Sequence, residues 1–375
     1  MRLIKGLLQK NLIVRRGAVR GKKKMLLSYI VHPFILNQNR TLHTNIQEVK
    51  LICEIAISKG YSLDIVDYRN TRNIDLSIYD YVFGFGEQVE RLFKGSVNAD
   101  TDVVVLATGS FYTFQNRVAI ERLQRYRERY GECTSNVVRV VEDCWPLQWS
   151  MANRLLVIGN SVTASTFPKI TQRVVTCLSA SYIKNTNAWK ILNRKKGAAV
   201  RKKNVLWFGG PAFVHKGLDL VLEALRFDLD KDVKLHICGV ENDDNDFLRL
   251  KASYSDLPIT SYGMISLDSP EFSFLMDLCT YVVLPSCSEG QATSVINVVA
   301  NSGMLPIITR EVGLDMNHGA IEILSCDFES VHRSLVEAFS MMDAEYFERC
   351  SANLDYIVNA NSPEKYISCL EESAF

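Results

Sequence analysis

The chain has 375 residues, of which 47% are hydrophobic and 23% are charged, and its formal net charge is +1. This length allows two or three domains, each with its own hydrophobic core. A net charge so close to zero argues against bulk binding of nucleic acid, and no run approaches the roughly 20 apolar residues of a membrane span.

The charge is distributed unevenly, because residues 1–24 contain nine Lys or Arg and no acid. The rest of the chain holds 34 basic and 42 acidic residues, a balance of −8. Within this arm, apolar residues recur at helical spacing: Leu3, Ile4, Leu7, Leu8 and Leu12. A basic amphipathic helix suits an anionic membrane surface, so we expect peripheral membrane contact through residues 1–24. A disordered basic tail or a short packed helix is the alternative.

Strand-like and helix-like patterns alternate in the first half of the chain. The expected strands are residues 24–35, 61–68, 79–85, 102–110, 136–143 and 154–160. The expected helices are one that runs from near Ile46 to Gly60, a short one through Phe93 and a charged one over residues 115–131. Such alternation predicts a parallel sheet with right-handed crossovers.

The alternation restarts in the second half, after a basic and polar stretch. The expected strands are residues 203–210, 233–239, 281–286 and 304–309, and the expected helices are residues 216–226, 289–303, 328–343 and 362–372. We therefore expect an α/β protein with two doubly wound Rossmann-like domains facing a cleft, where ligands bind at strand carboxyl ends.

The predicted domain boundaries follow these patterns. The basic arm covers residues 1–24, the first domain 25–180, the linker 181–202 and the second domain 203–360. A C-terminal helix over residues 361–375 could pack back on the first domain.

The ten cysteines are scattered singly, and none forms a close pair such as C-x-x-C. This pattern indicates reduced thiols in the cytosol, not disulfides or zinc ligands. The six histidines are also dispersed, so the sequence predicts no metal site.

One glycine turn in the second half precedes a lysine. A strand ends at Gly209 and Gly210, and Lys216 with Gly217 opens a helix. Glycines let the backbone approach a ligand closely, while a helix N-terminus offers free N–H groups and a partial positive charge. This combination suits a diphosphate, although it matches neither G-x-G-x-x-G nor a P-loop. A plain turn beside a solvated lysine is the alternative interpretation.

A second strand–loop–helix turn carries an acid. Glu289 and Gly290 lie in the loop before a helix whose buried face is lined by Ala292, Val295, Ile296 and Val299. A carboxylate at this place could accept hydrogen bonds from the hydroxyls of a polyol. Alternatively, Glu289 only interacts with the helix dipole or caps the helix.

Together, these motifs resemble the donor-binding domain of group-1 retaining glycosyltransferases of the GT-B fold. The matching stretches are FGGPAFVHKGLDLVLEAL, LHICGV, YGMI and LPSCSEGQATSVINVVANSGMLPIITREVGLD, which cover about 110 residues. In the first half, VVLATGSFYTFQNRVAIERL and LLVIGNSVTASTF look like a bacterial branch that builds surface polysaccharides.

The resemblance implies roles for particular residues. Lys216 would bind the donor diphosphate and help the leaving group depart. Glu289, the first acid of the family's E-x7-E motif, would bind hydroxyls of the transferred sugar. The backbone positions that would border the nucleotide-sugar are Gly209, Gly210, Gly239, Gly263, Gly290 and Gln291.

Two positions depart from the family pattern. Many relatives carry an Arg where this chain has Gly210, so one phosphate-binding charge is missing. The second acid of E-x7-E, which usually holds the ribose, is Asn297 here. Because an amide also hydrogen-bonds hydroxyls, we expect Asn297 to contact the ribose.

Loops that follow strands of the first domain supply the candidates on the acceptor side. His43 and Asn45 could cap a helix and also face an acceptor, and Asn160 marks a turn at a strand end. Glu142 and Asp143 follow an expected strand, where a carboxylate pair could orient an acceptor hydroxyl and so take part in catalysis. A helix cap before Pro146 is the alternative for this pair.

The resemblance implies transfer of a sugar, with retention, from a nucleotide-sugar to a glycan or lipid-linked saccharide. No protein base and no metal or other cofactor would be needed, because a donor phosphate oxygen takes the acceptor proton. We expect a cytoplasmic enzyme, peripheral on the inner face of the plasma membrane. A non-catalytic scaffold with this fold and a sugar-nucleotide epimerase are the alternatives.

Overall fold

The computed structural model describes residues 10–17, 23–35, 44–95, 101–170, 173–197, 203–227 and 232–375. The chain forms two compact units. The first unit comprises residues 1–109, 142–179 and 363–375, and the second comprises residues 110–141 and 180–362. Residues 110–141, which the sequence places in the first domain, thus belong to the second unit.

The first unit is built on a seven-stranded sheet in the order β1-β3-β2-β4-β5-β6-β7. The strands are β1 (Ile13–Arg16), β2 (Lys23–Tyr29), β3 (Tyr61–Asp67), β4 (Tyr81–Gly84), β5 (Asp102–Ala107), β6 (Arg154–Ile158) and β7 (Val174–Leu178). All pair in parallel except β1. Met25, Leu26 and Leu27 of β2 are fully buried, as expected for a parallel strand that is covered on both faces.

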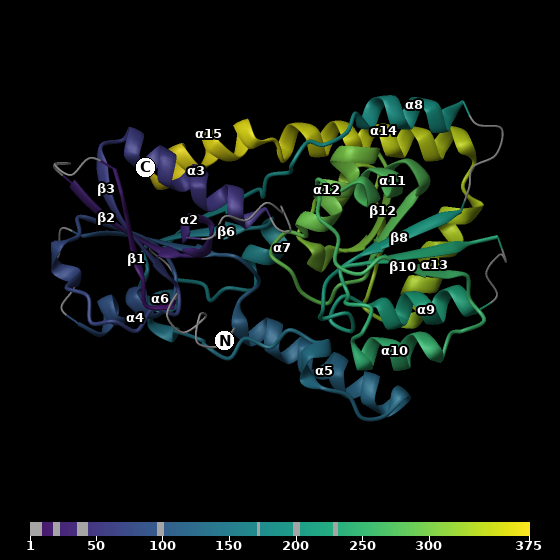
Figure 1. The fold of residues 1–375 in the computed structure, drawn as a ribbon, viewed down its shortest axis with the longest axis horizontal. Helices are drawn as coiled ribbons and strands as arrows, with labels where there is room; N and C mark the ends of the chain where they lie inside the picture. The colour runs from purple at the N-terminus through teal and green to yellow at the C-terminus, as the bar shows by residue number, and fades with distance from the viewer. Residues whose placement is uncertain are drawn as a thin grey trace. The chain divides into compact units, whose positions relative to one another are not determined.

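Helices cover both faces of this sheet (Figure 1). They are α2 (His32–Ile35), α3 (Asn45–Ser58), α4 (Glu87–Lys94), α6 (Pro146–Met151), α7 (Ser161–Ala164) and α15 (Pro363–Ala374). The C-terminal helix α15 packs against α3 and buries Tyr366 and Leu370 in the first unit.

The arm is not a continuous helix. Residues 13–16 form β1, which pairs antiparallel with β3, and Arg15 Nε lies 3.3 Å from Asp64 Oδ1. Strand β2 begins at Lys23, so residues 23 and 24 are also extended. The β-branched Ile13 and Val14 favour a strand at this edge of the sheet. The helix expected over residues 1–24 is therefore wrong for these residues, while residues 1–9 and 18–22 lie outside the described ones.

The second unit contains a six-stranded, wholly parallel sheet in the order β10-β9-β8-β11-β12-β13. Its strands are β8 (Asn204–Phe208), β9 (Lys234–Cys238), β10 (Ile259–Ser261), β11 (Tyr281–Leu284), β12 (Leu305–Thr309) and β13 (Ile321–Ile323). This is the doubly wound order, and β8 and β11 are the neighbours at which the strand order reverses. The expected α/β fold with two parallel-sheet units is confirmed.

The helices of the second unit also lie on both faces of the sheet (Figure 1). They are α5 (Tyr112–Tyr130), α8 (Ala188–Lys196), α9 (Leu218–Arg226), α10 (Asn245–Ala252), α11 (Pro270–Leu278), α12 (Thr293–Ser302), α13 (Phe328–Ser340) and α14 (Asp343–Ala360). Helix α8 lies within the linker expected over residues 181–202 and packs its buried Ile191 and Leu192 against α12 and α14.

A buried ion pair attaches α5 to the rest of the second unit. Arg122 Nη2 lies 2.7 Å from both carboxylate oxygens of Asp219 and 3.3 Å from Val214 O. The two side chains are 5% and 4% exposed. Burying either charge alone would be strongly unfavourable, and the ion pair compensates for the loss of water around both groups.

The strand expected over residues 136–143 does not form. Residues 135–137 make a single 3₁₀ turn, Val138 is extended, and residues 139–143 belong to no helix or strand. Val137 O instead accepts hydrogen bonds from Val214 N and His215 N, and the Asn116 amide pairs with Val141 N and O. The β-branched residues that predicted a strand are thus held by a loop and a side chain.

The first unit buries one carboxyl group that has no partner among the described residues. Glu48 of α3 is 3% exposed, and its Oε1 makes no hydrogen bond in the described part of the chain. Burial raises the pKa of Glu48 from near 4.5 to about 7. Its neutral form is therefore favoured in the folded state.

We predict that Glu48→Gln stabilises the protein at pH 8 but not at pH 5. Because the folded-state pKa is raised, the folded form binds the proton more tightly, and the stability gained below pH 4.5 is lost as the pH rises through 7. The shift corresponds to roughly 3 kcal/mol. Thermal unfolding at both pH values tests this, with the exposed Glu54→Gln on the same helix as control. An equal change in Tm at pH 5 and pH 8 would contradict it.

Candidate active site

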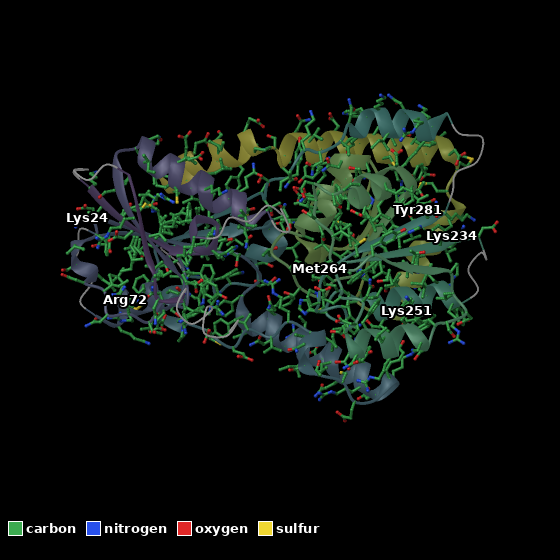
Figure 2. All side chains as sticks on the ribbon, viewed as in Figure 1. Lys24, Arg72, Lys234, Lys251, Met264 and Tyr281 are labelled. Atoms are coloured by element: carbon green, nitrogen blue, oxygen red, sulfur yellow. The ribbon has the colours of Figure 1, made fainter. Side chains whose placement is uncertain are left out.

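A glycine lies just after the end of each of three neighbouring strands of the second sheet. Gly209 comes after β8, Gly239 after β9 and Gly263 two residues after β10. Gly239 has a φ of +97°, and a Cβ there would lie 2.6 Å from Gly209 O. Side chains are therefore excluded at this contact, and the carboxyl-end edge of the sheet presents bare backbone. In Figure 2, Met264 marks this edge, while Lys234 and Tyr281 mark the amino ends of β9 and β11.

Lys216 is fixed by the loop that joins β8 to α9. The next residue, Gly217, has a φ of +68°, and a Cβ there would lie 2.5 Å from Pro285 O. The β8–α9 and β11–α12 loops therefore touch at this glycine. Trp207 Nε1 also donates a hydrogen bond of 3.1 Å to Lys216 O, which holds the lysine backbone against the sheet.

Glu289 lies in the loop between β11 and α12, opposite Lys216. Lys216 Nζ is 2.6 Å from Glu289 Oε1, and Ser286 Oγ donates to the same oxygen at 3.1 Å. Arg139 Nη1 lies 3.6 Å from the other oxygen, Oε2. The side chains of Glu289 and Lys216 are 6% and 16% exposed. The structure thus brings together the two residues that the sequence singled out, which are 73 positions apart.

Surrounding basic side chains keep this buried carboxylate ionised. Burial alone would raise the pKa of Glu289, but Lys216, Arg139 and His215 lower it to about 2. Burial lowers the pKa of His215 to about 4, although Glu289 opposes this change. At neutral pH the site therefore holds two cations, one anion and a neutral imidazole.

His215 and Arg139 are site residues that the sequence analysis missed. His215 is fully buried, and its Nε2 lies 2.8 Å from Ser288 O. Its backbone O accepts a hydrogen bond of 3.0 Å from Cys287 N, so it ties the two loops together. The position of His215 next to Lys216 was the available signal. No sequence signal pointed to Arg139, because it lies in a run that predicted a strand.

Residues 190–315 match the family described as glycosyl transferases group 1. This stretch, about a third of the chain, is therefore similar to a group-1 glycosyltransferase domain. No curated protein matches the chain. The family match covers the stretch from α8 to beyond β12, which includes both Lys216 and Glu289.

Solved structures share the fold of this chain. They include S. aureus TarM (G117R mutant) in complex with fondaparinux, alpha-GlcNAc-glycerol and UDP, at 13% identity and a TM-score of 0.53, covering 78% of this chain and 54% of TarM. An E. coli trehalose-6-phosphate structure bound with UDP-2-fluoro glucose has 11% identity and a TM-score of 0.55, covering 94% and 98%. Anabaena HepE in complex with UDP and glucose has 10% identity and a TM-score of 0.57, covering 93% and 98%.

These similarities show that the fold is GT-B. The chain spans about half the length of TarM. In the described part of the chain, no group of three or more His, Cys, Asp or Glu side chains is placed to hold a metal ion. Among the same residues, no helix has the length and apolar character needed to cross a membrane.

Asn297 of α12 has a role that the sequence did not predict. It is 1% exposed, and its Oδ1 accepts a hydrogen bond of 2.9 Å from Ile183 N. Its Nδ2 donates to Thr293 O at 2.7 Å. Asn297 therefore holds the connector, residues 180–186, which precedes α8. The ribose contact implied by the resemblance would require this buried amide to leave both partners.

Two further amides hold the same connector. Asn301 Oδ1 accepts hydrogen bonds from Asn185 N at 2.8 Å and Thr186 N at 3.0 Å. Gln291 Oε1 accepts one from Ala180 N at 2.7 Å. The connector lies beside α12 and the loop before it without ladder pairing, so these side chains satisfy its backbone in place of a strand. The backbone role implied for Gln291 and Gly290 stays a prediction.

The remaining donor-side position, Gly210, lies beside the Lys216 side chain. A Cβ at Gly210 would lie 3.8 Å from Lys216 Cε, which is ordinary van der Waals contact. A Cβ would therefore be accommodated at this position.

The acceptor-side candidates belong to the first unit. Glu142 and Asp143 are exposed in a coil segment before α6. Asn160 caps α7, because its Oδ1 accepts a hydrogen bond of 3.0 Å from Val162 N. Asn45 is the first residue of α3, while His43 lies outside the described residues. Their contacts with an acceptor stay predictions.

We predict that Asn297→Asp destabilises the second unit at neutral pH. The aspartate keeps an acceptor for Ile183 N but turns a second oxygen toward Thr293 O, so a buried hydrogen bond becomes a repulsion. The cost should be about 1–3 kcal/mol and should diminish in acid, where protonation restores a donor.

Thermal unfolding at pH 7.5 and pH 4.5 tests this prediction. Asn359→Asp is the matched control, because Asn359 Nδ2 makes the same kind of bond, 2.8 Å to Asp355 O, on an exposed face. If both variants lose the same stability at pH 7.5, the prediction is wrong, and the buried contact of Asn297 with the connector contributes no more to stability than the exposed contact of Asn359.

Proposed function

We propose that the chain moves a sugar, with retention at the anomeric carbon, from a nucleotide-sugar to a glycan or lipid-linked saccharide in surface-polysaccharide synthesis. The observation that carries this proposal is the Lys216–Glu289 pair at the switch point of a glycosyltransferase domain. UDP is the first nucleotide to test, since three solved structures of the same fold are described with UDP or a UDP-sugar.

The chemistry assigns different tasks to the two residues. The bond between the anomeric carbon and the diphosphate oxygen breaks, and a bond to the acceptor oxygen forms on the same face. Negative charge grows on the departing diphosphate, where Lys216 and the N–H groups near the start of α9 stabilise it. Glu289 accepts hydrogen bonds from sugar hydroxyls, and a donor phosphate oxygen takes the acceptor proton. Glu142 and Asp143 would orient the acceptor hydroxyl.

We predict that Lys216→Met lowers kcat/KM for the donor by about 100-fold or more, because leaving-group charge loses its nearest cation. Glu289→Gln should also lose most transfer activity while the protein stays folded. Lys234→Met is the matched control, since this exposed lysine lies at the amino end of β9 (Figure 2).

The measurement is nucleotide release from UDP-, GDP- and ADP-sugars, after a thermal-shift panel has identified the donor that raises Tm. If wild type binds a donor but releases no nucleotide with or without acceptor, the non-catalytic scaffold is the better interpretation. If Lys216→Met retains full activity, the assignment of Lys216 is wrong.

We also propose that the cytoplasmic enzyme contacts the inner membrane face through residues 1–24. The nine cations of this arm support the proposal. Deleting residues 1–9 removes four of the five apolar positions and leaves β1 and β2 intact. We predict that this deletion lowers partitioning onto vesicles of anionic lipid, measured by co-sedimentation, and has no effect with zwitterionic vesicles. Unchanged partitioning on anionic vesicles would refute the proposal.

A further inference from the structure

Both ends of the segment 110–141 reach Glu289. At its start, Ser110 Oγ donates a hydrogen bond of 2.9 Å to Glu289 O. Near its end, Arg139 Nη1 lies 3.6 Å from Glu289 Oε2. Between these two residues, the chain runs away from Glu289 as α5 and comes back beside the β8–α9 loop. This segment of the first half of the sequence therefore builds part of the donor side.

The backbone around Arg139 is firmly held. Val137 O accepts hydrogen bonds from Val214 N at 3.0 Å and His215 N at 3.1 Å. Arg139 O accepts one of 3.1 Å from Gln115 Nε2, and Val141 is paired with the Asn116 amide. Because the backbone is hydrogen-bonded on both sides of Arg139, the side chain extends from a fixed position beside the site.

The guanidinium itself has unused hydrogen-bonding capacity. Its side chain is 48% exposed, and 3.6 Å is longer than a hydrogen bond. Within the described residues, none of its N–H groups donates to an acceptor. Arginine presents its donors in a planar fork that matches the oxygens of a phosphate.

The charges of the site require a second cation. Lys216 is 2.6 Å from Glu289, and this pair alone is neutral. A neutral pair attracts a diphosphate weakly, and a phosphate that draws Lys216 away would leave a buried carboxylate unpaired. Arg139 provides a net positive charge and keeps a cation beside Glu289.

We propose that Arg139 is a diphosphate-binding residue of the donor site, which holds a phosphate oxygen and balances Glu289 when Lys216 turns to the leaving group. This inference rests on the proposed function and adds a residue to it. Arg139 is delivered by a segment outside the stretch that matches the family, residues 190–315.

The test compares wild type, Arg139→Gln and Arg139→Lys, with Arg117→Gln as control. Arg117 lies in the same segment, is 60% exposed and is paired with Glu121, so the control removes the same charge away from the site. Binding of uridine, UMP and UDP, or of the nucleotide series that the thermal-shift panel selects, is measured by calorimetry at low and high salt. Unliganded Tm values establish that each variant is folded.

We expect Arg139→Gln to weaken binding of the diphosphate about tenfold or more and to leave the nucleoside unchanged. Its diphosphate affinity should depend less on salt than that of wild type. Arg139→Lys should recover part of the affinity, and in turnover KM for the donor should rise more than kcat falls.

Two results would overturn the assignment. One is a diphosphate affinity of Arg139→Gln within twofold of the Arg117→Gln value. The other is an equal loss for nucleoside and diphosphate, which would indicate a structural role. A wild-type protein that binds no nucleoside diphosphate would refute the proposed function first, and the role of Arg139 with it.

Discussion

The site of the second unit is built around one buried carboxylate that stays charged. A carboxylate that is 6% exposed would take up a proton unless cations and donors surround it. Here Lys216 and Ser286 meet one oxygen, and Arg139 approaches the other. Each of these groups comes from a different loop, so the ionised Glu289 also fixes how the three loops meet.

The sheet order explains why Lys216 and Glu289 meet. Strands β8 and β11 are hydrogen-bonded neighbours, although they lie far apart in sequence. The loops that follow them both lie at the carboxyl edge of the sheet at the switch point, where they touch at Gly217. This arrangement allows a lysine after one strand to reach a glutamate after the other, as Lys216 and Glu289 do. For this reason, the pair was predictable from two strand–loop–helix patterns and the assumption of a parallel sheet.

Other parts of the site were not predictable, for physical reasons. The run around Arg139 is rich in β-branched residues, which indicate a strand when only local propensity is considered, yet its partners are Val214, His215 and an amide of α5. The prediction of a helix over the basic arm was wrong for the same reason. The helical spacing of the leucines carries no information about the pairing of β1 with β3. Local pattern predicted the nine strands β2–β6, β8, β9, β11 and β12, but it missed β1, β7, β10 and β13 and did not reveal which partners satisfy the segments between strands.

Asn297 shows how a motif position can serve a second purpose. Helix α12 begins just after the loop that carries Glu289, and its buried face carries Asn297 and Asn301, which hold the connector. An acid at position 297 would accept the Ile183 N–H but could not donate to Thr293 O. An amide satisfies both groups without burying another charge. Since two cations already accompany Glu289, a second buried carboxylate at position 297 would need a compensating partner of its own, and the neutral amide of Asn297 avoids this requirement.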